Sequence, residues 1–439
     1  MNRTTHRRTF LKSAAMAGLA APIVRRSWGH PLGANESVNI ACIGVGGKGQ
    51  SDMMETSAGQ NIVAICDIDE QRLAAAAARF PKAKKYTDWR KLLEQNDIEA
   101  VTVSTPDHTH APATLSAISL GKHVYTQKPL THDVFESRVL ADAAAKAGIV
   151  SQMGIQHHSS ARLKIAVQVI RDGAIGKVSE VHTWTDRPGT FWKQGLTRPA
   201  QGDAVPAHVH WNLWLGTAPE RPFVNGLYHA FHWRGWWDFG TGALGDMGCH
   251  IMDPVVNALE LGPPQTVEAD GPEPHAESGP LWCVVNYEFP GTKHTTDTLK
   301  MTWYEAGKMP PRELFKAPDD WPGSKNGVLF VGEKGNLFVG FPEMPELFPK
   351  ADFADYKMPE LEDNNHYTQW TSAILGNGET SCPFSYSGPL TETVLLGNVA
   401  YRSGTKVHWD SENLRAIDNP KANALLRRKY RGEFATSGL

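Results

Sequence analysis

Apolar runs alternate with helical segments through the first third of the chain. Residues 39–43 and 62–66 are apolar, and a helical segment that ends near residue 58 separates them, which is the order of a β-α-β unit. The alternation continues through two more strands and two more helices, at 99–105, 111–120, 123–126 and 134–147. The pattern predicts an α/β domain with a doubly wound parallel sheet over residues 36–152.

The pattern changes after residue 152. A helix is expected at 161–171, and the strands that follow are not separated by helices; they are expected at 177–185, 282–289 and 299–304 and as a pair between 328 and 339. This order predicts an α+β domain over residues 153–439 with a largely antiparallel or mixed open sheet. A helix near 390–401 is expected to pack back toward the first domain.

A glycine-rich turn joins the first two strands. It reads Gly44-Val-Gly46-Gly47-Lys-Gly49, which fits G-x-G-x-x-G directly after a strand and at the start of a helix. Gly44 permits the tight turn, Gly46 lets backbone amides approach a pyrophosphate, and Gly49 allows close packing of helix on strand. We therefore predict a Rossmann domain whose cofactor loop consists of these four glycines.

An acidic residue, Asp67, ends the second strand. A carboxylate at this position accepts hydrogen bonds from an adenosine ribose and repels a 2′-phosphate, so it favours NAD over NADP. Arg72 lies close enough in sequence to leave use of both cofactors open. Asp69 is expected to cap the following helix instead.

The loop Ser104-Thr105-Pro106-Asp-His108-Thr-His110 leaves the carboxyl end of a strand, where doubly wound sheets bind their ligands. Thr105 and Pro106 are predicted cofactor contacts. Histidines in loops are often structural, and the spacing alone leaves open whether His108 or His110 contacts a ligand.

These motifs, together with Gly121-Lys-His-Val-Tyr-Thr-Gln127-Lys128-Pro129, resemble the glucose-fructose oxidoreductase and inositol dehydrogenase family, often called Gfo/Idh/MocA. In that family the strand ends in Glu-Lys-Pro, and the lysine reaches the substrate beside the nicotinamide. The resemblance gives Lys128 this role and adds His110 and Gln127 to the predicted cofactor contacts. Gln127 departs from the family's glutamate: it keeps the hydrogen-bonding capacity and loses the charge.

A second family signature is Gly240-Thr-Gly-Ala-Leu-Gly-Asp246-Met-Gly-Cys-His250. The resemblance implies a substrate-binding Asp246 and a catalytic His250. Their spacing puts both side chains on one face of a helix, and Pro254 should kink that helix. By spacing alone such a pair is more often a cap or a core pair than a catalytic one.

Oxidation of an alcohol by hydride transfer needs a general base within hydrogen-bond reach of the hydroxyl. We assign His250 as this base, Lys128 as the polarising and proton-relay group, and Asp246 as the group that holds a substrate hydroxyl. Asp253 is a candidate for a supporting role, with a structural role equally open.

Aromatic residues concentrate between residues 184 and 237 and end in His-Trp-Arg234-Gly-Trp236-Trp237. About half are expected in the core, and the rest are suited to stack on a sugar ring. The leading substrate class is a carbohydrate or cyclic polyol. The predicted substrate contacts are Gln156, His157, Arg234, Trp236, Trp237, Asp246 and His250.

The first residues, Arg7-Arg8-Thr-Phe-Leu-Lys before an alanine-rich apolar stretch, predict a twin-arginine signal and linker over residues 1–35. We therefore expect export of the folded, cofactor-loaded protein to the periplasm. No apolar run approaches the roughly 18 residues of a membrane span, and a net charge of −3 argues against nucleic acid as a partner.

The five cysteines are scattered, and no pair of histidines has a recognised zinc spacing, so neither a disulfide framework nor a metal site is predicted. The resemblance adds the expectation of a homodimer or homotetramer.

The expected function is NAD-dependent transfer of a hydride between a hydroxyl carbon of a sugar, glycoside or cyclic polyol and the nicotinamide. Two alternatives stay open. One is an NAD-dependent glycoside hydrolase that works by transient oxidation at C3 and elimination, and the other is a non-catalytic sugar-binding protein.

Overall fold

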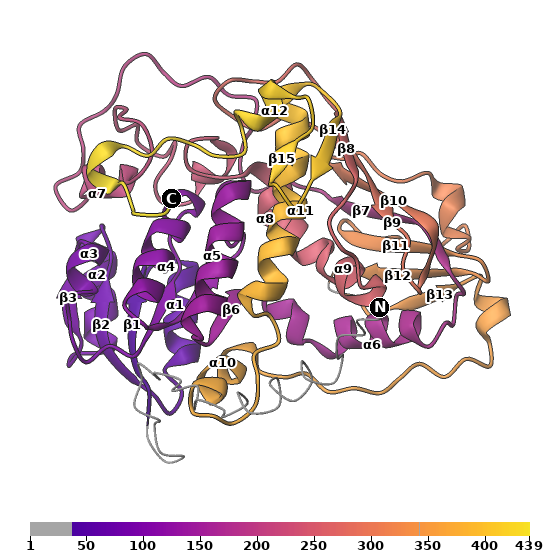
Figure 1. Ribbon diagram of the computed structural model, residues 1–439, viewed down its shortest axis with the longest axis horizontal. Coiled ribbons are helices and arrows are strands. Elements are labelled where there is room, and N and C mark those ends of the chain that lie inside the picture. Colours follow the sequence, from indigo (N-terminus) through magenta and orange to yellow (C-terminus); the bar gives the residue numbers. More distant parts are fainter. Residues whose placement is uncertain (1–36, 342) are drawn as a thin grey trace, which may run out of the picture.

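The computed structural model describes residues 37–341 and 343–439. The predicted signal and linker, residues 1–35, lie outside the described residues. Figure 1 shows two sheets side by side, one from the early part of the chain (indigo to purple) and one from the later part (orange), with the long helix α11 (Phe384–Ser403) between them. The predicted two-part α/β architecture is confirmed.

The first sheet is parallel and has six strands in the order β3-β2-β1-β4-β5-β6. The strands are β1 (Asn39–Ile43), β2 (Asn61–Cys66), β3 (Lys84–Tyr86), β4 (Ala100–Val103), β5 (His123–Gln127) and β6 (Ser151–Gly154). Strands are added outward on either side of β1 and β4. The crevice beyond the carboxyl ends of these two strands is where such a sheet binds its ligand.

Helices cover this sheet and connect its strands: α1 (Lys48–Thr56), α2 (Glu70–Arg79), α3 (Trp89–Leu92), α4 (His110–Ser119) and α5 (Val134–Ala147). The sequence determines the ends of α5 locally. Asp133 and Glu136 form a reciprocal capping box at its start, and Gly148, at φ 64°, ends it in the left-handed conformation, as expected for these residue types.

The second sheet has nine strands in the order β13-β12-β11-β7-β10-β9-β8-β14-β15. They are β7 (Val178–Thr185), β8 (Thr266–Asp270), β9 (Val284–Pro290), β10 (Thr295–Glu305), β11 (Gly327–Gly332), β12 (Asn336–Gly340), β13 (Glu346–Phe348), β14 (Val407–Asp410) and β15 (Arg415–Ala416). Strands β7 and β10 are parallel, and the other pairs are antiparallel. The sheet is therefore mixed.

The remaining helices are α6 (Ala161–Arg171), α7 (Trp211–Leu215), α8 (Gly242–Ile251), α9 (Asp253–Leu259), α10 (His366–Ile374) and α12 (Pro420–Asn423). A single residue, Met252, separates α8 from α9, and Pro254 lies in the first turn of α9. Proline is tolerated at a helix start but not in a helix interior. The expected kink is therefore a complete break.

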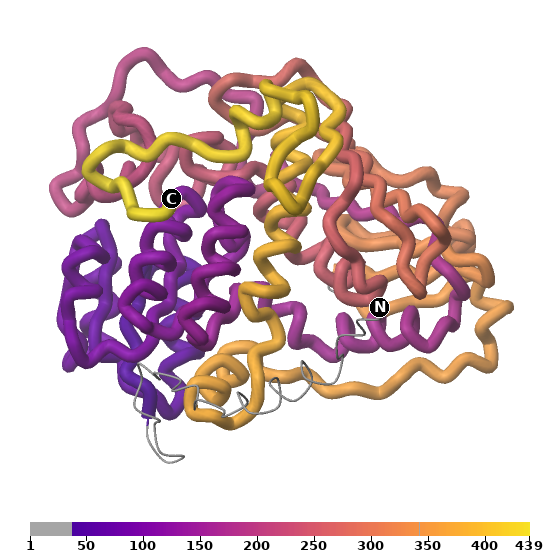
Figure 2. Tube along the Cα trace, viewed as in Figure 1, coloured from indigo at the N-terminus to yellow at the C-terminus, as the bar shows by residue number. Residues whose placement is uncertain are grey.

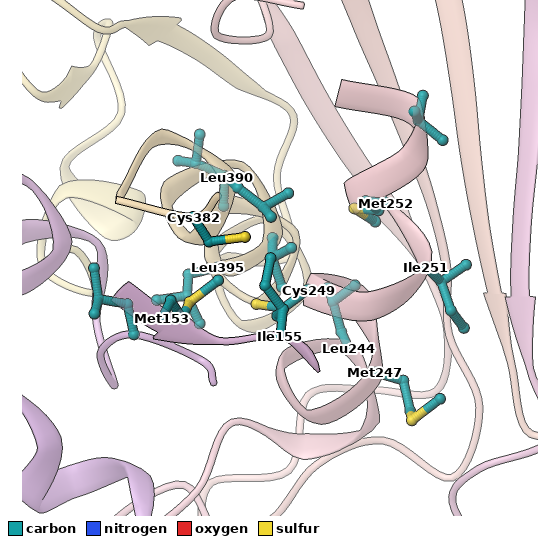
Figure 3. Packing of buried hydrophobic residues seen from close by; sticks show 14 of the residues in the cluster. Met153, Ile155, Leu244, Met247, Cys249, Ile251, Met252, Cys382, Leu390 and Leu395 are labelled. Carbon is teal, nitrogen blue, oxygen red and sulfur yellow. The ribbon is translucent and has the colours of Figure 1, made fainter. Parts of the chain in front are cut away.

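An apolar seam joins the two domains. Helix α11, which contains the predicted 390–401 segment, packs on α5 of the first domain and on α8 of the second. Figure 3 shows Leu390 and Leu395 of α11 beside Cys249 and Leu244 of α8 and Met153 of β6. These side chains are at most 4% exposed, so the seam is a continuous core that fixes α8 relative to the Rossmann sheet.

Residues 208–234, which we call the strap, extend from the second domain across the first; their pink trace lies at the upper left of Figure 2. The backbone N–H of Glu70 donates to the carbonyl of His208 (2.9 Å), and that of His210 donates to the carbonyl of Ile68 (2.9 Å). The strap therefore docks on the segment that directly follows β2.

Candidate active site

The glycine turn has the geometry that a dinucleotide loop requires. Gly44 has φ +80°, and a Cβ there would lie 2.5 Å from the carbonyl oxygen of Ser104. A Cβ on Gly49 would lie 1.9 Å from the carbonyl oxygen of Gly44, so only glycine lets α1 pack this closely on β1. Gly46 and Gly47 line the adjoining cavity at the start of α1, and the N-terminal end of a helix favours a pyrophosphate.

The acidic residue after β2 has a position suited to a ribose. Asp67 lines the cavity, and its carboxylate accepts hydrogen bonds from the N–H groups of Val45 and Asp69 (both 3.0 Å). Burial raises the pKa of Asp67, and these two hydrogen bonds oppose that shift. Asp69 caps α2 by accepting the N–H of Gln71 (3.0 Å), as predicted.

Both domains line this cavity, which has a volume of about 340 Å³. The Rossmann side includes the glycine loop, Thr105, Pro106, Gln127 and Lys128. The other side includes Asp246 of α8 and part of the strap: Leu213, Trp214, His229, Ala230, Phe231, Trp233 and Arg234. The glycine cradle, the acidic residue and the interdomain position fit a dinucleotide that extends from Asp67 toward Lys128.

Asp246 is the centre of the polar network between the domains. Its Oδ1 lies 2.8 Å from Lys128 Nζ and 3.1 Å from Arg234 Nε, and its Oδ2 lies 2.9 Å from Arg187 Nη1. Lys128 also donates to the backbone carbonyl of Asp246 (2.7 Å). Burial opposes ionisation, but the three cations outweigh it, so the pKa of Asp246 lies well below its usual value.

A second acid, Asp107, is buried near this network. It accepts a hydrogen bond from the Thr241 hydroxyl (2.7 Å), and burial raises its pKa to about 7. Asp107 therefore changes its charge near neutral pH, in contrast to Asp246.

His250 lies one helical turn after Asp246 on α8, but it lines a separate small cavity with His157, Arg162 and Phe341. The ring centroids of His157 and His250 are 5.6 Å apart, and Nδ1 of His250 is buried without a hydrogen-bond partner among the described residues. Burial and the charge of Lys128 lower the pKa of His250 well below its usual value, so the ring is neutral at pH 7 and is a weaker base than a free imidazole.

Two histidines of the loop after β4 are structural braces. The ring nitrogens of His110 each lie 2.8 Å from a carbonyl oxygen, of Pro129 and of Thr105; those of His108 lie near the carbonyl oxygens of Phe239 and Trp214. The buried ring of His110, a predicted cofactor contact, ties together the two loops that carry Thr105 and Lys128 and is not among the residues that line the cavity.

Three predicted substrate contacts line neither the main cavity nor the cavity of His250 and His157. Trp236 and Trp237 are 1% and 5% exposed; Trp236 packs in an aromatic cluster, and the Trp237 indole donates to the carbonyl of His275 (3.0 Å). The amide of Gln156 donates to the Tyr125 hydroxyl (2.7 Å). These three side chains have partners within the protein, and the structure does not bring them together with Lys128 and Asp246.

Gln127 has a partner that explains its amide. Its Nε2 donates to Oδ2 of Asp52 (2.8 Å), a fully buried residue of α1 whose carboxylate also accepts from Ser104, Tyr367 and Lys48. A glutamate at 127 would meet this carboxylate. The amide of Gln127 therefore donates where a glutamate would repel.

Several site residues carry no local sequence signal. Arg187 follows β7 and is 59 residues from Asp246 in sequence, and Asp52 is 75 residues from Gln127. Neither belongs to a local motif. The cavity aromatics Trp214, Phe231 and Trp233 lay within the aromatic-rich segment, but no local signal separated them from their buried neighbours.

No three His, Cys, Asp or Glu side chains of residues 37–341 and 343–439 come close enough to share a metal ion. None of the helices in these ranges is long and apolar enough to span a bilayer.

Family models match both parts of the chain. The model described as an oxidoreductase family with an NAD-binding Rossmann fold matches residues 38–155, and that family's C-terminal α/β domain matches residues 161–296. The chain belongs to the Gfo/Idh/MocA oxidoreductase family. Its first domain is the family's NAD-binding domain, which agrees with the glycine loop and Asp67.

Named relatives of this Gfo/Idh/MocA protein include a levoglucosan dehydrogenase of Pseudarthrobacter phenanthrenivorans, 26% identical over 43% of the chain and 40% of the relative. A glycosyl hydrolase family 109 protein of Saccharopolyspora erythraea is 28% identical over 39% of the chain and 44% of the relative. The chain thus matches less than half the length of each.

A solved structure extends the likeness to the whole fold. The WlbA dehydrogenase of Bordetella pertussis, in complex with NADH and UDP-GlcNAcA, superposes with a TM-score of 0.60 over 85% of this chain and 99% of that one, at 16% identity. At this identity the likeness concerns the fold alone.

Proposed function

We propose that this protein is an NAD-dependent oxidoreductase that moves a hydride between a hydroxyl carbon of a sugar, glycoside or cyclic polyol and the nicotinamide. One observation carries the proposal. Lys128, the residue directly after β5, and Asp246 of α8 meet at 2.8 Å on the wall of a cavity that also includes the glycine loop. A substrate bound there would contact groups from both domains beside the cofactor.

When bound, NAD supplies the hydride acceptor. Lys128 would stabilise the negative charge that develops on the substrate oxygen, since a cation in a partly buried site acts strongly on such a charge. Asp246, which stays ionised, would accept a hydrogen bond from a neighbouring hydroxyl. Arg234, which pairs with Asp246 on the same side of the cavity, would contact the substrate beside it.

His250 would take the hydroxyl proton as general base. Its Nδ1, which is buried without a hydrogen-bond partner among the described residues, and its position one turn from Asp246 support this role. Because His250 and His157 line a neighbouring cavity, a substrate that reaches the base would have to extend past Asp246 toward these two rings.

The glycoside hydrolase mechanism is the second candidate. The similarity to the glycosyl hydrolase family 109 protein favours it, and transient oxidation at C3 would use the same lysine, aspartate and histidine. The two functions differ in the product and in whether reduced cofactor remains. A non-catalytic sugar-binding role is a third proposal, and the assembled Lys128–Asp246 pair argues against it.

We further propose that the chain belongs to an exported subgroup with a twin-arginine signal, that it works in the periplasm and that it forms a homodimer or homotetramer. The first two proposals rest on Arg7-Arg8 and the apolar stretch that follows. The third rests on the family resemblance. Fractionation of cells that express the tagged chain, beside an Arg7→Lys, Arg8→Lys variant, tests the export route.

Product analysis tests the activity. The purified protein is incubated with NAD and a panel of free sugars, inositols and alkyl or aryl glycosides. The masses of the products are then measured by mass spectrometry. A keto product lighter by two hydrogens, lost in Lys128→Met and retained in the exposed control Lys91→Met, supports the dehydrogenase. A panel with no keto product and no cleaved glycoside contradicts both catalytic proposals.

A further inference from the structure

Positive charge exceeds negative charge where the two domains meet. Lys128, Arg187 and Arg234 all pair with the single carboxylate of Asp246, at 2.8, 2.9 and 3.1 Å. In the described ranges 37–341 and 343–439, these three cations form no other ion pair. One carboxylate neutralises one cation, so the cluster keeps a charge of about +2.

The neighbouring titratable groups do not remove this excess. Asp107 is buried, and its pKa near 7 leaves it only partly ionised at neutral pH. His250 and His157, whose pKa values burial lowers, add no charge. An oxidised nicotinamide ring would itself be cationic, so the cofactor would add to the excess.

The cofactor phosphates do not require this cluster. The N-terminal end of α1 favours the pyrophosphate, and two basic residues of the cavity wall, Lys48 and Arg72, lie on α1 and α2. The Asp246 cluster instead joins the end of β5 to the second domain. The excess positive charge of the cluster is therefore available to the substrate.

Both guanidinium groups are held in place by aromatic rings. The Arg187 guanidinium carbon lies 4.1 Å from the centroid of Phe191, and that of Arg234 lies 4.2 and 4.4 Å from the centroids of Phe231 and Trp233. Stacking fixes the plane of a guanidinium without using its N–H donors. Nε of Arg234 donates to Asp246 (3.1 Å) and its Nη1 donates to the carbonyl of Phe231 (3.0 Å), so Nη2 is the donor that Arg234 can offer a ligand. Nε of Arg187 is buried without a hydrogen-bond partner among the described residues.

From this geometry we propose that the substrate is an acidic sugar whose carboxylate is bound by Arg187 and Arg234. A guanidinium presents a planar fork that matches a carboxylate, and such charge-assisted pairs are the strong ones in a partly buried site. The carboxylate would balance the excess charge while the hydroxyl to be oxidised lies near Lys128. This proposal rests on the dehydrogenase function proposed above.

Matched substrate pairs test the proposal. The pairs differ only in the carboxylate: glucose with glucuronic acid, galactose with galacturonic acid, and methyl glucoside with methyl glucuronide. With NAD present, the acidic member of at least one pair is expected to have a kcat/KM at least tenfold higher. Arg187→Gln and Arg234→Gln should each lower that value about a hundredfold and reduce the preference for the acid, whereas the exposed control Arg415→Gln should change neither.

Binding is measured alongside turnover by calorimetry with NADH-loaded protein, and thermal unfolding shows whether each variant is folded. Oxidation of neutral sugars with no advantage for the acids overturns the carboxylate proposal and leaves the dehydrogenase standing. If no member is oxidised, tighter binding of the acids still supports the proposal, and equal or absent binding overturns it. An acid preference that survives in both folded arginine variants also overturns it.

Discussion

Replacement of Gln127 by glutamate should place two carboxylates in contact beneath the glycine loop. In the native protein, Gln127 Nε2 donates to Oδ2 of Asp52 across 2.8 Å, and the Asp52 side chain is fully buried. The substitution exchanges this donor for an acceptor and adds a charge. No other partner of Asp52 has to change.

The cost follows from the distance. Two unit charges about 3–4 Å apart repel by roughly 4–6 kcal/mol at an effective dielectric constant near 20. Lys48 Nζ, 2.7 Å from Oδ1 of Asp52, reduces this value. Binding one proton at pH 7 to a carboxyl with an ordinary pKa near 4.3 costs about 3.7 kcal/mol, at about 1.36 kcal/mol per pH unit. The pair should therefore bind a proton, and the variant should lose about 2–4 kcal/mol of stability.

Because the folded variant binds a proton that the unfolded chain releases, its stability should fall further below wild type as the pH rises above about 5. Urea unfolding at pH 5, 6, 7 and 8 measures this for wild type, Gln127→Glu, Asp52→Asn and the double variant. The double variant exchanges donor and acceptor and should recover most of the loss at pH 8. A loss that does not depend on pH, or a double variant no more stable than Gln127→Glu, would refute the reasoning.

Three further predictions concern the site. His229→Ala removes a 3.1 Å contact between the strap and Asp69 and should speed NAD release about fivefold in a displacement assay; an unchanged rate means that the strap does not hold the cofactor. His250→Asn should lower kcat about a hundredfold or more and leave NAD affinity unchanged. Because the pKa of His250 is lowered, the ring stays neutral between pH 8 and pH 6, and the wild-type rate should not fall over this range through protonation of this base. Asp107 has a pKa raised to about 7, so the folded state keeps its proton to a higher pH than the unfolded state does. The stability of the folded protein should therefore fall as the pH rises from about 4 to 7. Unfolding curves of Asp107→Asn should lack this contribution, and an unchanged pH dependence contradicts the assignment.

The sequence predicted what local chemistry determines. The glycine turn follows from steric limits within one β-α-β unit, and the spacing from Asp246 to His250 places both on one helix. The alternation of apolar runs and helical segments predicted the parallel sheet for the same reason. Each of these features depends on residues that are neighbours in sequence.

Contacts over long sequence separations were not predictable. Arg187 reaches Asp246 only because β7 ends beside α8, and Asp52 reaches Gln127 only because α1 packs against the end of β5. Trp236 and Trp233 are equally apolar and three residues apart, yet one packs wholly in the core while the other also lines the cavity. That difference depends on how the strap folds over the first domain, which no local pattern specifies.

The fate of one hydrogen atom tests the central claim most directly. A sugar or glycoside that the enzyme converts is deuterated at the reacting carbon, and the cofactor and product are recovered after a single turnover with stoichiometric NAD. The account predicts deuterium on the nicotinamide and a keto product without it. A cleaved glycoside that keeps its deuterium, with no label left on the cofactor, would contradict the dehydrogenase and favour redox-assisted hydrolysis.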